Sequence, residues 1–525
     1  MPCQCKMFSR GLLLLAGVLS VGVARAQEPA QQPPAAVSDP DKKPTADEKI
    51  STGPPPQETS VVQKLEHKPN PLVPTPQTDA ASTRASASEA QPVSTMFPHP
   101  DGTLWWVSGQ ANIIFQAHPG FHSPYQGVNS FRNAGEYKTS LLGSLYLGAR
   151  VYHSTHTNTE FFYHEESTGG RGLGQALGLA GFTNLDVVRN PSLGSVPYTA
   201  RMEIHETIGF GSQQEDMTDE RGPFSLATSA PVRRFDFRAG KLSTVDNFDV
   251  NGVGSDSHLQ FADWAVDNNA AYDYAADTRG YTYGALLEYH DKAWSARYGV
   301  MLMPTVANGV TLDWALRRAR GEQAEEEVRH SLIQGRNGTT RFLEYWNHAH
   351  MGDYRQSVQE YLADPAAFPS GPVIQATEKF GALKYGFGIN NEQEITDYLR
   401  LFGRFGWNEG QHESFAYTEV DQTWLFGGDY RGDQWGRKQD KFGIAYVTDA
   451  IKKDHQNYLA LGGLGFLLGD GRLHYAREDI VEAYYNAHAY RGLYFALQQF
   501  YIAHPGYNLD RGPVYVGGVR AHVDF

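Results

Sequence analysis

Arginine and glutamate side chains recur at two-residue spacing in this sequence, and that spacing puts them on one face of an extended strand. Arg201 and Glu203 are the clearest example. A guanidinium offers several N–H donors and a carboxylate offers only acceptors, so such a wall can bind hydroxyl groups while its own charges offset each other. The chemistry is reversible recognition of a solute rich in hydroxyl groups. The charged candidates are Arg150, Arg201, Glu203, Arg238, Glu288, Arg297, Arg400 and Arg404.

Aromatic side chains near these positions could add stacking contacts. The apolar body of Trp346 suits the flat face of a ring-shaped solute, and Trp106, Tyr146 and Tyr398 offer the same kind of surface. Charged residues are ordinary on strands that face water, so a binding role gains support only where several of these side chains converge at one height.

Alternating segments carry these candidates. Apolar and polar residues alternate along residues 105–116 and 140–151, and each segment has the length of about 10 residues that a tilted strand needs to cross a bilayer. Bacterial outer-membrane barrels close with an even number of strands. We therefore predict an all-β fold, a transmembrane antiparallel up-and-down β-barrel of 16 strands, with 18 as the alternative. Further segments with this pattern are 198–210, 234–242, 281–290, 294–303, 340–350, 383–394, 399–407, 414–425, 442–448, 475–485 and 492–502.

The closing segment has the sharpest alternation. Tyr515, Val519, Val523 and Phe525 fall on one face, which can meet lipid, while Arg520 falls on the face that can meet water. An aromatic residue is the usual close of such chains. We expect Phe525, Val523 and Tyr515 to form the signal that the barrel-assembly machinery reads.

The region before the barrel divides into two parts. Basic residues precede an apolar run, and Ala24-Arg25-Ala26 supplies the small residues that signal peptidase needs, so residues 1–26 form a predicted signal peptide. Residues 27–95 are rich in Pro, Ala, Ser and Gln and poor in apolar groups, which predicts a disordered Pro-rich periplasmic linker. Residues 96–525 form the predicted barrel domain.

Composition limits the function classes. The only cysteines, Cys3 and Cys5, precede the predicted cleavage site, which excludes disulfides and thiolate metal sites in the mature chain. A formal charge of −14 argues against nucleic acid as a partner. The 29 Tyr, 27 Phe and 9 Trp residues suit aromatic girdles at membrane interfaces. We therefore place the protein in the outer membrane of a Gram-negative-type bacterium, in contact with its lipid.

Some stretches do not read as strands. Apolar residues at helical spacing predict helices at 308–330 and 354–363, and the glycine-rich run 169–181 predicts a loop with a helical turn. Long loops of a barrel lie outside the cell or fold into the lumen. The sequence does not decide which of these three folds inward.

Two groups of potential metal ligands do not indicate a metal site. His348 and His350 would point the same way, near Asp353, but no second group of ligands accompanies them, so we expect a structural or lumenal role. The acidic segment after Lys241 could bind Ca²⁺, but its carboxylates lack a recognisable ligand spacing, so we expect a solvated loop. We predict no metal and no other cofactor.

The C-terminal part carries a family resemblance. The run Gln499–Val514, with its Pro505-Gly506-Tyr507-Asn508 turn and the Arg511-Gly512-Pro513 entry to the closing strand, resembles the carbohydrate-selective porins of the OprB-like family. The resemblance is strongest over residues 471–525. It implies a 16-stranded porin through which small sugars diffuse passively, and a monomer rather than a trimer.

Three other classes remain as alternatives. A general, non-selective diffusion porin would share the barrel but not the sugar preference. A barrel enzyme would need a nucleophile with a nearby base, and no Gly-x-Ser-x-Gly or comparable arrangement occurs, so we predict no enzymatic activity. A secreted all-β carbohydrate-active enzyme would also use carboxylates and aromatics, but lipid-facing alternation up to Phe525 argues against it.

Overall fold

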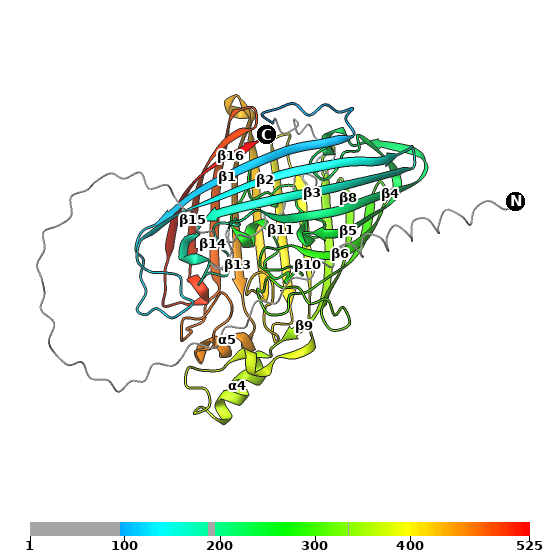
Figure 1. Ribbon diagram of the computed structural model, residues 1–525. Helices are drawn as coiled ribbons and strands as arrows, with labels where there is room; N and C mark the ends of the chain where they lie inside the picture. The colour runs from blue at the N-terminus through cyan, green and yellow to red at the C-terminus, as the bar shows by residue number, and fades with distance from the viewer. Residues whose placement is uncertain (1–94, 187–194, 334) are drawn as a thin grey trace, which may run out of the picture. The chain divides into compact units, whose positions relative to one another are not determined.

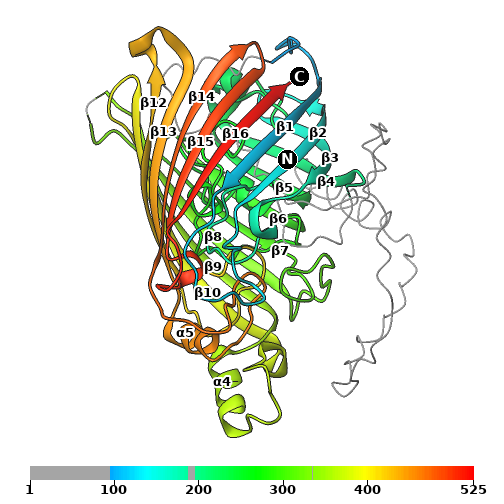
Figure 2. The same ribbon diagram turned by 90° about the vertical axis from the view of Figure 1, so that its left-hand side faces the viewer.

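Sixteen antiparallel strands close into one barrel, in which each strand pairs with its sequence neighbours and β16 pairs with β1 (Figures 1 and 2). The computed structural model describes residues 95–186, 195–333 and 335–525. The predicted barrel and its strand number are thereby confirmed. The strands are β1 (Trp105–His118), β2 (Glu136–His153), β3 (Thr157–Gly170), β4 (Tyr198–Asp216), β5 (Ser229–Leu242), β6 (Thr282–His290), β7 (Trp294–Met301), β8 (Arg320–His330), β9 (Gly338–Met351), β10 (Lys379–Glu394), β11 (Leu399–Asn408), β12 (Gln422–Gly432), β13 (Arg437–Ala450), β14 (Glu478–Tyr490), β15 (Leu493–Ala503) and β16 (Val514–Asp524).

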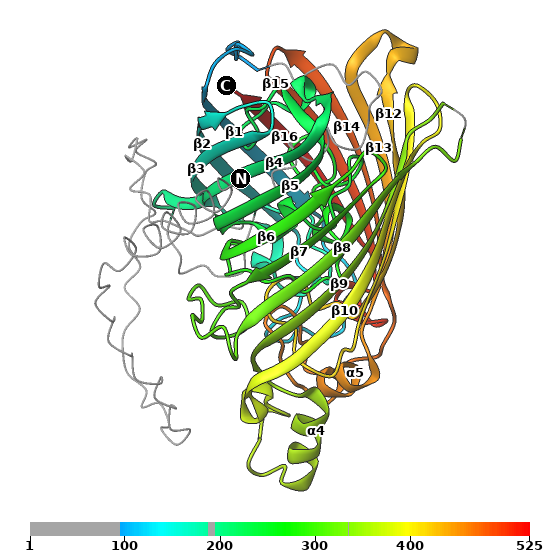
Figure 3. The same ribbon diagram turned by 90° about the vertical axis from the view of Figure 1, so that its right-hand side faces the viewer.

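Short helices lie in the connections between strands. In the described ranges, no helix is long and apolar enough to cross a membrane. Figure 3 shows α4 and α5 beside each other at one end of the barrel. The helices are α3 (Trp264–Asp267), α4 (Tyr354–Ala363) and α5 (Lys453–Ala460), with 3-10 turns η1 (Leu173–Gln175), η2 (Thr218–Glu220), η3 (Thr244–Asp246), η4 (Ile374–Thr377), η5 (Asp433–Trp435) and η6 (Pro505–Tyr507).

Apolar residues face outward and polar residues face inward along the strands that were predicted most clearly. On β1, the side chain of Trp105 is 60% exposed while that of Trp106 is 7% exposed. On β16, Tyr515 is 59% exposed and Arg520 is 1% exposed. Because successive side chains of a strand point to opposite faces, each of these strands presents one face to lipid and the other to the lumen.

Three predicted elements differ from the structure. The predicted helix at 308–330 is wrong, because its second half is strand β8. Glu325 and Glu327 of β8 face inward while Glu326 faces outward, so polar residues on both faces hid the alternation. Strand β3 was missed, and β12 begins only at Gln422, so residues 414–421 are not strand. Helix α4 is confirmed with its predicted bounds.

The two ends of the barrel differ in the length of their connections. Two residues join β14 to β15, whereas 27 residues join β9 to β10 and 39 join β5 to β6 at the other end. Short turns are periplasmic and long loops extracellular in outer-membrane barrels. The C-terminus lies at the end of the barrel away from α4 (Figure 1). Because the short turns lie at that end, it is the periplasmic end.

Residues 243–281, which connect β5 to β6, fold into the barrel, and we call them the inner loop. Side chains of the wall bind its backbone: Tyr345 donates to the Ala271 carbonyl at 2.8 Å, and Arg520 donates to the Ser257 carbonyl at 2.7 Å. Asp263 caps α3 by accepting from the N–H of Ala265. The prediction of a solvated acidic loop is wrong, because Asp249, Asp263, Asp273 and Asp277 are buried and each accepts a backbone N–H group.

The glycine-rich run also folds inward. Glu478 of β14 accepts hydrogen bonds from the backbone N–H groups of Ala180, at 2.8 Å, and Gly181, at 3.0 Å. Leu173, Leu179 and the neighbouring residues are buried in the same apolar core as the inner loop. The extracellular half of the lumen is therefore packed with loop residues.

Candidate functional site

A chain of ion pairs runs around the inner wall from β3 to β10, and we call it the charged belt. It begins where His205 lies between Glu160, at 3.5 Å, and Asp236, at 3.0 Å. Arg234 then links Asp236, at 2.7 Å, to Glu215. The belt consists of Glu160, His205, Glu215, Arg234, Asp236, Glu288, His290, Arg297, Glu325, Glu327, Arg341 and Glu392.

Arg297 of β7 is the centre of the belt. Its Nε lies 3.1 Å from Glu288, its Nη1 2.6 Å from Glu325 and its Nη2 3.0 Å from Glu327. A planar guanidinium presents its donors in a fixed fork, so three carboxylates from β6 and β8 can share it. Arg341 continues the belt, with Nε 3.0 Å from Glu327 and Nη1 2.9 Å from Glu392.

A second group of charges lies on β11, β12 and β13. Arg400 pairs with Asp429 at 2.5 Å, and Lys441 lies 3.7 Å from the same carboxylate. The side chains of Arg400 and Lys441 are 20% and 28% exposed, compared with 4% for Arg297. This group is therefore the more accessible to solvent.

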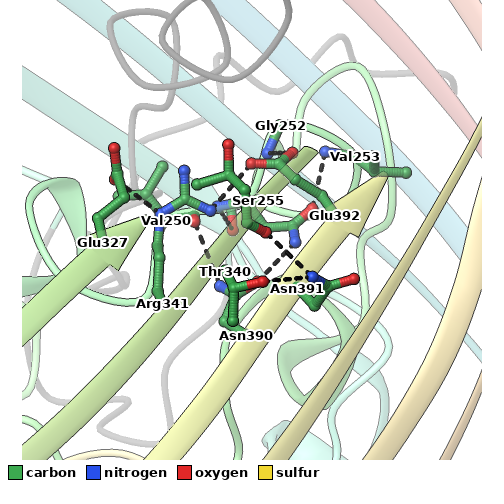
Figure 4. A network of polar contacts seen from close by, with 12 residues as sticks. Val250, Gly252, Val253, Ser255, Glu327, Thr340, Arg341, Asn390, Asn391 and Glu392 are labelled. Carbon is green, nitrogen blue, oxygen red and sulfur yellow. Dashed lines mark hydrogen bonds and ion pairs between the residues drawn. The ribbon is translucent and has the colours of Figure 1, made fainter. Parts of the chain in front are cut away.

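The inner loop touches the belt at β10. Glu392 accepts from Arg341 through one oxygen and from the backbone N–H of Gly252 through the other, at 2.8 Å (Figure 4). Asn390 donates to the carbonyl of Asp249 at 2.8 Å. Glu325 likewise accepts the N–H of Asp249 at 2.7 Å. The belt therefore fixes the loop that narrows the lumen, in addition to lining the wall.

Burial changes the protonation of the inner loop. It raises the pKa of Asp263 and of Asp267 well above the usual range, and it raises the pKa of Asp277 to about 6. Desolvation disfavours a charged carboxylate, and the neighbouring carboxylate Glu482 adds to the effect at Asp263. The negative charge of the inner loop is therefore smaller than its composition suggests.

The charged candidates from the sequence all face the lumen, and the structure brings some of them together. Glu203 pairs with Arg238 at 2.9 Å, and Glu288 pairs with Arg297. Arg201 lies on the same face as Glu203, but its partner is Asp246 of the inner loop, at 2.6 Å. The remaining inward contacts are Arg150 with Asn158, Arg400 with Asp429 and Arg404 with Asp249.

The predicted inward position of Trp346 is wrong. Trp346 shares the outward face of β9 with Phe342, while Tyr345 points inward and binds the inner loop. Two adjacent aromatic residues left the register of this strand ambiguous. Tyr398 also lies beside the outward-facing Tyr430, with ring centroids 5.2 Å apart.

Several belt residues were missed. Glu325 and Glu327 escaped because β8 was read as a helix. Arg341 and Glu392 lie inside segments that were predicted as strands, at inward positions. The signal that identifies both is a charged residue at an inward-facing position of a predicted strand.

The histidine pair lies outside the lumen. His350 stacks on Phe380, with centroids 4.0 Å apart, and its Nδ1 lies 3.3 Å from Glu378. Among the residues that the structure describes, no group of three or more His, Cys, Asp or Glu could hold a metal ion.

Comparisons with known proteins agree with this architecture. The model of the family described as carbohydrate-selective porin, OprB family, matches residues 201–525. A high-pH structure of Pseudomonas putida OprB is similar, with 15% identity, a TM-score of 0.59, and coverage of 80% of this chain and 94% of that chain. The outer membrane channel DcaP of Acinetobacter baumannii has 9% identity and a TM-score of 0.44, with 82% and 100% covered. No curated protein matches the chain.

Proposed function

This chain belongs to the OprB family of carbohydrate-selective porins, and we propose that sugars contact the accessible group Arg400, Asp429 and Lys441 as they cross the barrel, while the buried charged belt sets the charge and shape of the wall. The protein is an integral β-barrel of the outer membrane and a porin for small carbohydrates. Residues 471–525, which resemble this family most strongly in sequence, lie within the residues that the family model matches.

The difference in exposure between the two charged groups supports this proposal best. The side chains of Arg297 and its three carboxylates are at most 5% exposed, whereas those of Arg400 and Lys441 are 20% and 28% exposed and offer their donors to the lumen. Sugar hydroxyls both donate and accept, so they can exchange with water along such a surface without covalent chemistry.

The belt also suggests a charge preference. Its carboxylates outnumber its arginines, so an anionic solute is repelled while a neutral sugar is not. We therefore expect neutral sugars to pass more readily than acidic sugars of equal size, and small cations more readily than small anions.

Planar-bilayer recordings test the proposal. A neutral hexose should block the current of the wild-type channel, and a hexuronate should block it less. Arg400→Gln removes an accessible cation and leaves Asp429 less balanced, so it should weaken sugar block and shift the reversal potential further towards cations. Arg320→Gln is the matched control, because Arg320 pairs with Glu322 on the outward face of β8. If no sugar blocks the wild type, the protein is a general diffusion porin.

We further propose that one chain suffices for transport and that the protein is a monomer in outer-membrane lipid. All sixteen strands and every belt residue come from a single chain. Size measurement by light scattering in detergent, corrected for bound detergent, should give one chain per particle, and a trimer contradicts this.

A further inference from the structure

We propose that the connection between β4 and β5, residues 217–228, is a second constriction of the lumen, at the periplasmic exit, and that it limits the size of sugars that pass. We call it the exit turn. The proposal rests on the proposed sugar-porin function. The exit turn is longer than its neighbours, since three residues join β2 to β3 and three join β6 to β7 at the same end.

Apolar contacts place the exit turn inside the barrel. Phe224 and Leu226 are 5% and 1% exposed, and they form a buried cluster with Trp106, Tyr146 and Phe162. These three partners are inward-facing residues of β1, β2 and β3. The rings of Phe224 and Tyr146 meet edge-on at 5.7 Å, a geometry that aromatic pairs prefer. A turn that extended freely into the periplasm could not make these contacts.

Polar contacts fix the turn from β3, from β5 and from the segment that precedes β1. Glu160 of β3 accepts the N–H of Leu226 at 3.1 Å. Arg238 of β5 donates to the carbonyl of Phe224 at 3.4 Å. Beside β1, Arg221 donates to the hydroxyl of Thr103 at 2.7 Å. Since the other oxygen of Glu160 faces His205, the exit turn is anchored on the first residue of the charged belt.

The position of this cluster determines where a solute can leave. The glycine-rich run and much of the inner loop fill the extracellular half, and the inner loop continues to Glu392 and His522 near the periplasmic ends of β10 and β16. The exit turn fills the side of the lumen that β1 to β5 enclose. A 16-stranded barrel otherwise leaves a wide aqueous lumen. A sugar must therefore pass between the exit turn and the part of the opposite wall that the inner loop leaves accessible, where Arg400 and Lys441 lie. The rigid apolar filling sets the width of that passage.

A size series of neutral sugars tests the proposal. The double variant Phe224→Ser, Leu226→Ser removes the apolar contacts but keeps the length of the chain, and a second variant replaces residues 218–227 with Gly-Ser-Gly. In liposome-swelling assays, both should raise the rate for a trisaccharide relative to a monosaccharide by roughly threefold or more, because the narrowest part of a pore sets its size limit. Asp219→Ala, at an exposed position of the same turn, should leave the ratio unchanged.

A chemical probe covers the case in which these variants do not insert. Pro223→Cys, half-buried beside Phe224, introduces a single thiol into the mature chain, because Cys3 and Cys5 precede the predicted cleavage site. A bulky thiol reagent added from the periplasmic side should reduce its conductance, whereas labelled Asp219→Cys should conduct normally. Sugar block in the wild type with an unchanged size ratio in the inserted variants, or unaltered conductance of labelled Pro223→Cys, overturns the exit constriction. Absence of sugar block in the wild type instead overturns the proposed function.

Discussion

Arg201 holds Asp246 with two parallel hydrogen bonds, from Nε to Oδ2 at 2.6 Å and from Nη2 to Oδ1 at 2.8 Å. Its Nη1 also donates to the hydroxyl of Tyr281 at 3.3 Å. Asp246 lies near the start of the inner loop and Tyr281 at its end, so one guanidinium fastens both ends of the loop to β4. The same guanidinium lies over Phe224 of the exit turn, 5.1 Å from the ring centroid. Arg201 therefore ties both constricting segments to the wall.

Loss of Arg201 should loosen the inner loop. Arg201→Ala leaves Asp246 unpaired, and removing one partner of a buried ion pair costs about 3–5 kcal/mol. We expect faster proteolysis of residues 243–281 and a noisier, larger conductance in bilayers. Arg201→Lys keeps the charge but loses the two-pronged contact, so it should have an intermediate effect. Unchanged proteolysis and conductance in Arg201→Ala contradict the fastening role.

A glycine of the inward-folded run should not tolerate a side chain. Gly178 has a φ of +82°, and a Cβ atom there would lie 1.8 Å from the backbone nitrogen of Phe131. Gly178→Ala should therefore destabilise the packed loops by about 1–3 kcal/mol, measured as a lower temperature for the gel shift of the folded barrel. Gly211 also has a φ of +82° but has nothing within 4 Å of the added Cβ. If Gly211→Ala lowers the temperature equally, backbone strain alone explains the effect.

Alkaline pH should loosen the extracellular loop 409–421. Burial raises the pKa of Glu413 to about 8, although the N–H of Gly352, which donates to it at 2.7 Å, acts in the opposite direction. A folded pKa above the unfolded value means that this stabilisation is complete below the unfolded pKa and is lost as the pH rises through about 8. Hydrogen exchange in 409–421 should increase between pH 6 and 9. Glu413→Gln should remove that pH dependence, whereas Glu360→Gln, on α4, should retain it.

Phe525 should contribute to barrel closure. Its N–H donates to the carbonyl of Gly109 on β1 at 2.7 Å, and its ring stacks on Phe97 with centroids 6.4 Å apart. Phe525→Ser should lower the fraction of folded, membrane-inserted protein while synthesis stays constant, as measured by gel shift of unheated samples. Phe495→Ser alters another outward-facing aromatic residue, on β15, and serves as the control. Equal insertion of Phe525→Ser and the wild type would show that the assembly machinery does not need this residue.

Strands that separate apolar from polar residues were predictable from the sequence, and the rest were not. Trp105 and Trp106 lie on opposite faces as predicted because their neighbours alternate cleanly. Strand β8 was missed because Glu326 faces outward between the inward-facing Glu325 and Glu327, which removes the alternation. The strand pattern therefore predicted the barrel, but not every strand, and the family was predicted from the resemblance of Gln499–Val514.

The interior was harder to predict than the wall. Asp263 is buried in the structure, although an aspartate in a sequence usually indicates a solvent-exposed position. It accepts a hydrogen bond from the N–H of Ala265, which depends on a local backbone conformation that residue spacing does not predict. Arg201 pairs with Asp246 rather than with Glu203, which is nearer in the sequence. The inner loop folds into the barrel and brings a carboxylate that is distant in the sequence to the wall. Contacts that depend on a folded loop are invisible to a strand pattern.

The pairing of β1 with β16 affects both the rate of folding and the lifetime of the native state. Gln110 pairs with Asp524, so the contact that completes the ring joins segments almost the full barrel sequence apart. Closing so long a loop costs much conformational entropy, so this contact forms late in folding. Until it forms, β1 and β16 each have an unpaired edge that can aggregate. After closure, no strand is left at an edge from which fraying could start. Slow folding and long native lifetimes should therefore occur together in this protein.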